Sequence, residues 1–303
     1  MTIDIILAAY NGEKYINEQI DSLLAQTCRD ISIRVYDDGS TDGTVHIVRE
    51  YADNHDNIYL YRNKKNLGLT LNFLHGVKRS KADYIMLCDQ DDIWKPDKVE
   101  KTLSAMEDAC KEEGDKPVLV FTDADIYDGR TPKNRSFIKE SHYDVKKVDL
   151  SSLLMENKCI GCSVMINRAL ADKLEKIPMG IRYHDWWLAL IAAAFGRVVF
   201  LDEMTLLYRQ HGDNQVGGKS FASYVTDRLS GLMSQRRALD DTYRQGELFY
   251  AVYGRELTGK NSAAVRAFAL MRSDDFISKR MSALRYGFTK SGFIRNAGLF
   301  ILM

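Results

Sequence analysis

Three carboxylates stand within four residues at Asp89-Gln90-Asp91-Asp92. They follow the apolar run Tyr84–Cys88, which has the length of a buried strand, so the acidic cluster is expected on the loop at that strand's carboxyl end. Open α/β sheets bind their ligands at this edge. Neighbouring carboxylates repel one another unless a cation joins them, and hard divalent cations prefer oxygen ligands. The cluster therefore predicts a divalent metal site.

Three earlier loops are expected at the same edge of the sheet. They are Ala9-Tyr10-Asn11-Gly12, Asp37-Asp38-Gly39 and Asn66-Leu67-Gly68. Their glycines let the backbone approach a ligand closely, and the side chains of Asp38 and Asn66 suit the polar edge of a nucleotide base. The chain has neither the G-x-G-x-x-G pattern of dinucleotide-binding folds nor a P-loop. Phosphates bound here therefore need another positive partner, and a metal held by Asp91 supplies one.

The elements that position these loops alternate between strand and helix. Apolar runs predict strands at Ile3–Ala8, Ile31–Tyr36, Ile58–Tyr61 and Tyr84–Cys88, with amphipathic helices between them. Repeated β-α-β units imply an α/β fold with a mostly parallel sheet and right-handed crossovers. Later strands are expected at Val118–Thr122, Cys162–Ile166 and Val198–Leu201, around a polar loop at residues 128–148. Tyr183-His184-Asp185-Trp186-Trp187 opens a further helix.

The charge is balanced over the 303 residues, with 42 Lys and Arg against 42 Asp and Glu, so no nucleic-acid partner is expected. The balance hides an asymmetry. Residues 219–303 carry 14 basic and 7 acidic side chains, whereas residues 1–218 carry 28 basic and 35 acidic ones. This split predicts an acidic catalytic domain at 1–218 and a basic helical region at 219–303.

The cysteines and the hydropathy indicate where the protein works. Five scattered cysteines resemble reduced core residues of a cytoplasmic protein, and the single Cys159-Ile-Gly-Cys162 pair is not expected to bind zinc. The N-terminal residues do not read as a secretory leader. The longest apolar run, Trp186–Phe195, is shorter than the ~20 residues of a bilayer span. We therefore expect a cytoplasmic location, with peripheral attachment to the inner face of the plasma membrane left open.

The four loop motifs, in this order and spacing, resemble those of family 2 glycosyltransferases, which have the GT-A fold. The resemblance covers about the first two thirds of the chain, residues 3–215. The segments Cys88–Trp94 and His184–Trp187 are most similar to the rhamnosyltransferase-like branch that builds bacterial surface polysaccharides.

The resemblance implies a role for each motif residue. The first loops would hold the base and ribose of a dTDP- or UDP-sugar, and Asp89 would contact the ribose or a metal-bound water. Asp91 would coordinate Mn²⁺ or Mg²⁺ with the help of His211, and Arg209 would clamp the departing diphosphate. The residues assigned to donor binding are Ala9, Tyr10, Glu13, Asp38, Asn66, Gly68, Asp89, Gln90 and Arg209.

The resemblance also places Asp185 in the position of the general base of an inverting transfer. His184-Asp185 stands where the family usually has Glu-Asp, which leaves the base intact and the role of His184 open. The helix N-terminus would keep the Asp185 carboxylate ionised. Asp92, His184, Trp186 and Trp187 are assigned to the sugar or the acceptor. Asp185 could instead be a simple N-cap of the helix. Either tryptophan could be a core residue, and the spacing favours Trp187 over Trp186 as the one that faces inward.

Residues 219–303 mix basic and aromatic side chains on expected helices. This composition suits an anionic membrane surface, close to a lipid-linked glycan or growing polysaccharide acceptor. A helical hairpin packed on the catalytic domain, or against a second copy of the chain, explains the composition equally well. Two other functions also remain open: a metal-dependent nucleotidyltransferase or nucleotide-sugar hydrolase, and a non-catalytic subunit that binds sugar nucleotides.

Overall fold

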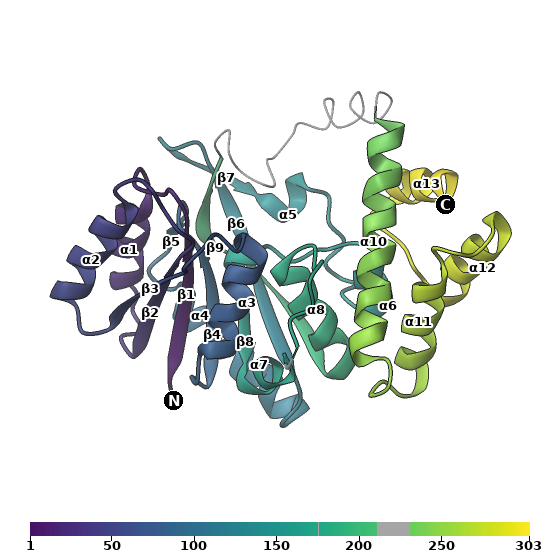
Figure 1. Cartoon of the computed structure of the whole chain (residues 1–303), viewed down its shortest axis with the longest axis horizontal. Coiled ribbons are helices and arrows are strands. Elements are labelled where there is room, and N and C mark those ends of the chain that lie inside the picture. The colour runs from purple at the N-terminus through teal and green to yellow at the C-terminus, as the bar shows by residue number, and fades with distance from the viewer. Residues whose placement is uncertain (175, 211–230) are drawn as a thin grey trace.

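A nine-stranded sheet forms the centre of the molecule and helices flank it (Figure 1). The structure is a computed structural model, and it describes residues 1–174, 176–210 and 231–303. Eight strands run in the order β3-β2-β1-β4-β8-β6-β9-β5, and β7 pairs with β6. The strands are β1 (Ile3–Ala9), β2 (Ile31–Asp37), β3 (Ile58–Arg62), β4 (Tyr84–Asp89), β5 (Ile93–Trp94), β6 (Val118–Tyr127), β7 (Pro132–Ser136), β8 (Met165–Asn167) and β9 (Arg197–Arg209).

The first half of the sheet is parallel, as the repeated β-α-β pattern predicts. Strands β1, β2, β3 and β4 all run in one direction, and Ala8 pairs with Tyr36 on one side and Asp89 on the other. The loops that follow these strands therefore meet at one edge. The second half is mixed, because β8 is antiparallel to both β4 and β6, while β6 and β9 are parallel. The predicted α/β fold class is confirmed.

Helices follow most of the strands, as the sequence predicts, and continue to the end of the chain. They are α1 (Ile16–Leu24), α2 (Thr44–Asn54), α3 (Leu69–Arg79), α4 (Lys98–Glu113), α5 (Phe137–Glu140), α6 (Leu150–Met155), the 3₁₀ turn η1 (Gly161–Ser163), α7 (Arg168–Lys173), α8 (His184–Phe195), α10 (Leu232–Tyr253), α11 (Gly259–Leu270), α12 (Phe276–Tyr286) and α13 (Phe293–Leu302). Two expectations need correction. The strand predicted at Cys162–Ile166 begins with η1, and the polar loop at 128–148 contains β7 and α5.

The C-terminal helices pack on the sheet-containing part of the chain through α6 and α8. Long helix α10 runs beside both in Figure 1, with α11, α12 and α13 beyond it. The Trp187 ring on α8 meets Phe249 and Tyr253 on α10, with ring centroids 5.4 and 6.1 Å apart. These contacts join the basic region to the helix that carries Asp185. No helix in the described part of the chain is long and apolar enough to cross a membrane.

Candidate functional site

The acidic loop connects β4 to β5 and is fastened to the end of β9. Asp89 ends β4, and Ile93 begins β5 four residues later. The backbone N–H of Arg209 donates to Oδ1 of Asp92 at 3.1 Å, and its Nε donates to the carbonyl of Asp91 at 2.7 Å. The end of the parallel half of the sheet is thereby held against the second half.

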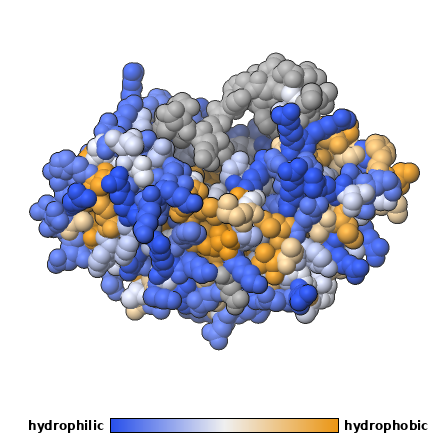
Figure 2. Space-filling view, viewed as in Figure 1, coloured by the Kyte–Doolittle hydropathy of each residue, from blue (hydrophilic) through white to orange (hydrophobic). Residues whose placement is uncertain are grey.

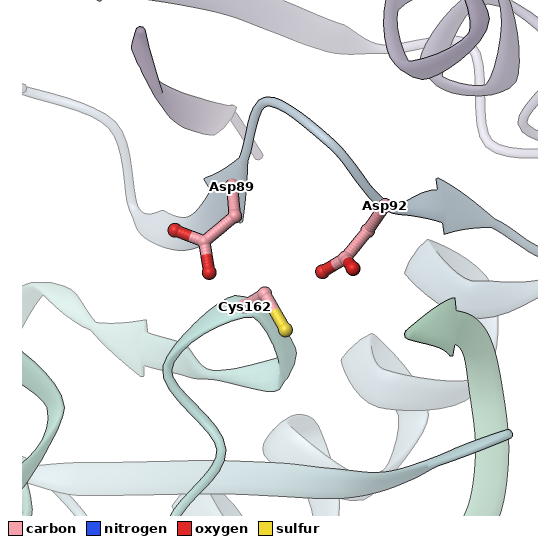
Figure 3. A group of neighbouring side chains, drawn as sticks. All are labelled: Asp89, Asp92 and Cys162. Carbon is pink, nitrogen blue, oxygen red and sulfur yellow. The ribbon is translucent and has the colours of Figure 1, made fainter. Parts of the chain in front are cut away.

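Two carboxylates of this loop converge on a cysteine from η1. Asp89 and Asp92 face a common gap above Cys162 in Figure 3, and one ligand atom from each of the three lies within 4.8 Å of the others. Burial raises the pKa of Asp89 well above its ordinary value, and the charges of Asp91 and Asp92 raise it further. Burial and Asp91 also raise the pKa of Asp92 to about 7. Two neighbouring carboxylates whose pKa values are raised by burial and by nearby negative charge fit a divalent cation, because a cation would offset their repulsion.

A buried lysine lies behind the loop. Lys98, the first residue of α4, is fully buried; its Nζ donates to Oγ1 of Thr205 at 3.2 Å and stands 4.7 Å from the centre of the Trp94 ring. Burial lowers the pKa of Lys98 to about 8, and the neighbouring Cys162, Cys88 and Asp92 oppose that shift. Lys98 therefore places a positive charge on the inner side of the acidic cluster.

Asp185 approaches the same cluster from the other half of the sheet. It lies in the first turn of α8, is only 7% exposed, and contributes to the raised pKa of Asp89 through its charge. Its carboxylate accepts hydrogen bonds from Nδ2 of Asn157 at 2.9 Å and from the N–H of Trp186 at 2.8 Å. Burial nevertheless raises the pKa of Asp185 to about 6. The expected stabilisation of the ionised form by the helix N-terminus is therefore outweighed, although a group with this pKa is still mostly ionised at neutral pH.

The neighbouring His184 is buried without a polar partner. Its ring stacks on Phe73 with centroids 4.1 Å apart, and neither ring nitrogen has a hydrogen bond within the described structure. Burial lowers the pKa of His184 to about 3, so the imidazole is neutral. Gly161 is required here, because a Cβ at that position would lie 2.9 Å from Nε2 of His184 and 3.6 Å from Oδ2 of Asp185.

The loops assigned to the nucleotide meet beside the acidic loop. Asp38 is buried, and its carboxylate accepts hydrogen bonds from the N–H groups of Leu67 and Gly68, both at 2.8 Å, and from Nδ2 of Asn63 at 2.9 Å. Asn66 is exposed and accepts the N–H of Gly68 at 3.0 Å. Asp38 thus shapes the Asn66–Gly68 loop as well as facing the edge of the sheet.

The first loop is clamped to the acidic loop by Gln90. Its side chain accepts the N–H of Tyr10 at 2.9 Å and donates to the Tyr10 carbonyl at 3.0 Å. This leaves the Tyr10 ring 48% exposed at the edge of the site. Ala9 is buried, and its carbonyl accepts the N–H of Asp38 at 2.8 Å. Glu13 accepts the N–H of Gly43 at 2.6 Å, which ties it to the turn before α2.

Five residues assigned to the sugar, the acceptor or the diphosphate have buried side chains: Asp92 and His184, described above, and Trp186, Trp187 and Arg209. Trp187 is fully buried against α10, so it is a core residue rather than a contact for a sugar. Trp186 is 3% exposed and donates its Nε1 to the carbonyl of Leu153 at 2.5 Å. The guanidinium of Arg209 pairs with Glu18 and lies between the rings of Tyr15 and Tyr127, so it is not open to a diphosphate in this structure. His211 lies outside the described residues.

Four residues of the site were not assigned from the sequence. Cys162 was interpreted as a core cysteine and Gly161 as part of the same pair, while Asn157 stands in a loop without a distinguishing pattern. The position of Lys98 could have been predicted from its spacing. It precedes the buried Thr102 and Met106 by four and eight residues and so lies on the same inward face of the helix.

Comparison with known sequences assigns this geometry to a family. The model of glycosyl transferase family 2 matches residues 4–174, more than half of the chain. The chain belongs to glycosyl transferase family 2. It is 31% identical over 228 residues to the dTDP-rhamnosyl transferase RfbG of Shigella flexneri, which covers 70% of this chain and 73% of that protein.

Further family 2 relatives carry less specific names. An uncharacterized glycosyltransferase of Rickettsia typhi is 30% identical over 212 residues, which is 69% of this chain and 64% of that protein. The chain thus spans less than two thirds of the length of this relative.

Solved structures confirm the GT-A fold of this family 2 chain. Staphylococcus aureus TarS 1–349, crystallised with UDP-GlcNAc, has a TM-score of 0.61 at 18% identity and covers 94% of this chain and 75% of that chain. The mannosyltransferase PcManGT from Pyrobaculum calidifontis, in complex with GDP-Man and Mn²⁺, has a TM-score of 0.54 at 15% identity and covers 99% of this chain and 86% of that chain. At these identities the likeness concerns the fold.

Proposed function

We propose that this protein transfers a sugar from a nucleotide-sugar donor to a glycan acceptor, with inversion at the anomeric carbon. One observation carries the proposal. The buried carboxylate of Asp185, in the first turn of α8, lies 3.6 Å from where a Cβ of Gly161 would stand, and the next residue, Cys162, stands with Asp89 and Asp92 of the acidic loop. A base and an acidic loop suited to a cation therefore face one site, as this reaction requires.

In the proposed reaction an acceptor hydroxyl attacks the anomeric carbon. The new glycosidic bond forms as the bond between that carbon and the donor diphosphate breaks, and Asp185 takes the hydroxyl proton. A base with a pKa near the working pH is effective at proton transfer, and burial gives Asp185 a pKa of about 6. The hydrogen bond from Asn157 fixes the orientation of the accepting carboxylate.

The acidic loop would hold the divalent cation through Asp91, with Asp89 and Asp92 beside it. When bound, the cation counters the negative charge that develops on the departing diphosphate. The role of His211 as a second ligand belongs to the same proposal. Gln90 keeps the Tyr10 loop against the acidic loop, so the base-binding and phosphate-binding parts of the donor site are positioned together.

For the donor we propose dTDP-rhamnose, and for the acceptor a growing cell-surface polysaccharide or a lipid-linked glycan. The dTDP-rhamnosyl transferase RfbG supports this choice by its 31% identity to the chain. Two structural neighbours are complexes with UDP-GlcNAc and with GDP-Man, so these two sugar nucleotides are the alternative donors to test against dTDP-rhamnose.

The experiment is a calorimetric titration of dTDP-rhamnose, UDP-GlcNAc and GDP-mannose into the protein, with Mn²⁺ and then with EDTA. We expect one donor to bind in Mn²⁺, with binding lost in EDTA and in Asp91→Asn. Asp97→Asn is the matched control, because within the described residues the Asp97 side chain forms an exposed ion pair with Lys101. Failure of every donor to bind in Mn²⁺ would contradict the proposal, and unchanged binding by Asp91→Asn would contradict the role of Asp91.

A further inference from the structure

The last two helices expose an unusual amount of apolar side chain. Of the thirteen large hydrophobic side chains exposed in the described part of the molecule, seven lie on α12 and α13. Figure 2 shows hydrophobic residues gathered at the end of the molecule formed by α12 and α13. Exposed patches of this kind mark surfaces that bind something apolar.

These side chains lie on one face of each helix. On α12, Ile277, Met281 and Leu284 have the spacing of a single helical face and are 66%, 65% and 74% exposed. On α13, Phe293, Ile294 and Ile301 share a face in the same way and are 87%, 58% and 74% exposed. We call these six residues the apolar face.

Arg280 fixes the two helices to each other. Its guanidinium donates to the carbonyl of Met303 at 3.0 Å and to that of Phe300, at the end of α13. Arg295 anchors the start of α13 to the rest of the protein through Oε1 of Glu156, at 2.9 Å. The apolar face is therefore carried by a rigidly attached pair of helices.

The surroundings of the apolar face are positively charged. Residues 259–303 contain eight Lys and Arg and only two Asp and Glu. In the described structure no carboxylate pairs with Lys279 or Arg285 on α12, and Arg285 is exposed beside Met281 and Leu284. Lys279 lies over the ring of Tyr243 and Arg285 over that of Tyr286, so their charges are not neutralised by a carboxylate. Apolar side chains bordered by such cations are complementary to a surface that is both apolar and anionic.

We infer that α12 and α13 form a docking surface for an anionic phospholipid bilayer, lying on the membrane with the apolar face inserted at the headgroup boundary. Basic amphipathic helices bind membranes in this way. A second copy of the chain fits less well, because a two-fold contact through this face would bring equal positive charges together. The surface deepens the proposed function by bringing a lipid-linked acceptor near the site, although binding to lipid does not itself require catalysis.

The test is co-sedimentation of the full chain with vesicles of phosphatidylcholine alone and of phosphatidylcholine mixed with phosphatidylglycerol. We expect binding to the mixed vesicles that weakens at high salt. The triple variant Ile277→Ser, Met281→Ser, Leu284→Ser should bind at least about tenfold more weakly. The double variant Met179→Ser, Tyr59→Ser removes exposed apolar side chains elsewhere and should bind like the unmodified chain.

Two further measurements separate charge from apolar insertion and lipid from self-association. Lys279→Gln with Arg285→Gln should weaken binding to the anionic vesicles and reduce its salt dependence. Circular dichroism should show an unchanged fold, because all of these positions lie at the surface. Absence of vesicle binding, or equal binding by the triple variant, overturns the inference.

The unmodified chain could instead self-associate without binding vesicles. If the triple variant loses that self-association, the apolar face binds a second copy of the chain. Donor titration on the same variants should be unchanged, so failure here is distinct from failure of the proposed function.

Discussion

Asp185 lies between two opposing influences on its pKa. Burial favours the neutral acid, whereas the hydrogen bonds from Asn157 and from the Trp186 N–H favour the carboxylate. The resulting pKa of about 6 makes the residue a stronger base than an exposed aspartate while leaving it mostly ionised at neutral pH.

The rate of transfer should therefore depend on pH through Asp185. Only the ionised carboxylate accepts a proton, so kcat/KM should fall about tenfold for each pH unit below about 6. Asn157→Leu removes a hydrogen bond to the ionised form, and the midpoint of the acid limb should move upward. The measurement is a pH–rate profile of both proteins. An acid limb that Asn157→Leu leaves in place would assign the titration to another group.

His184 should make the folded protein sensitive to acid. The unfolded chain binds a proton at the ordinary histidine pKa of 6.5, whereas the buried imidazole binds one only near 3. The folded state therefore loses stability relative to the unfolded state as the pH falls from 6.5 toward 3, and the contribution is fully present above 6.5.

His184→Leu should remove this part of the decline. Between pH 7.5 and pH 5, the loss of unfolding free energy should be smaller in the variant by roughly 1–2 kcal/mol. Urea unfolding at the two pH values measures it. Equal losses in both proteins would show that His184 is protonated in the folded state.

At the scale of elements, α8 joins the site to the C-terminal helices. Its first turn presents Asp185 and also buries Trp187 against Phe249 and Tyr253 on α10. Packing of α10 is therefore part of what fixes the position of the base.

Trp187→Ala should test this link. Loss of a fully buried indole should lower the unfolding free energy by about 3–5 kcal/mol. Because Trp187 is a core residue, Trp187→Phe should retain the donor Kd of the unmodified chain while lowering the thermal midpoint. If Trp187→Phe is as stable as the unmodified chain but binds the donor more weakly, Trp187 belongs to the donor site rather than to the core.

The elements that the sequence predicts best are those with strong apolar periodicity. Strands β1 to β4 appear within about a residue of their predicted ends, because each is an apolar run closed by an Asp, Asn or Gly turn. Strand β5 has two residues and leaves no such pattern, whereas β8 begins three residues after the start of the apolar run at Cys162–Ile166 that predicts it. Cys162 reaches Asp89 and Asp92 only through the order β4-β8-β6, a long-range pairing that local sequence does not encode.

At the scale of the whole molecule, the two halves of the sheet supply different parts of the site. In the proposed site, the parallel half would contribute Asp89 and Asp91 with the loops assigned to the nucleotide, and the mixed half Asp185 and the strand that holds Asp92. The C-terminal helices brace α8 and end in the apolar face. The charge division seen in the sequence thus corresponds to an acidic site and a basic helical end.

The most direct test of this account compares donor binding with turnover in Asp185→Asn. Once the titration identifies the donor, release of nucleoside diphosphate is measured with a panel of rhamnose- and N-acetylglucosamine-terminated glycolipid acceptors. We expect Asp185→Asn to bind the donor with an unchanged Kd and to lose acceptor-dependent turnover by about 10²–10⁴-fold. Acceptor-dependent turnover that survives in Asp185→Asn, or donor hydrolysis that needs no acceptor and ignores the variant, would contradict the assignment of Asp185 as the base of a sugar transfer.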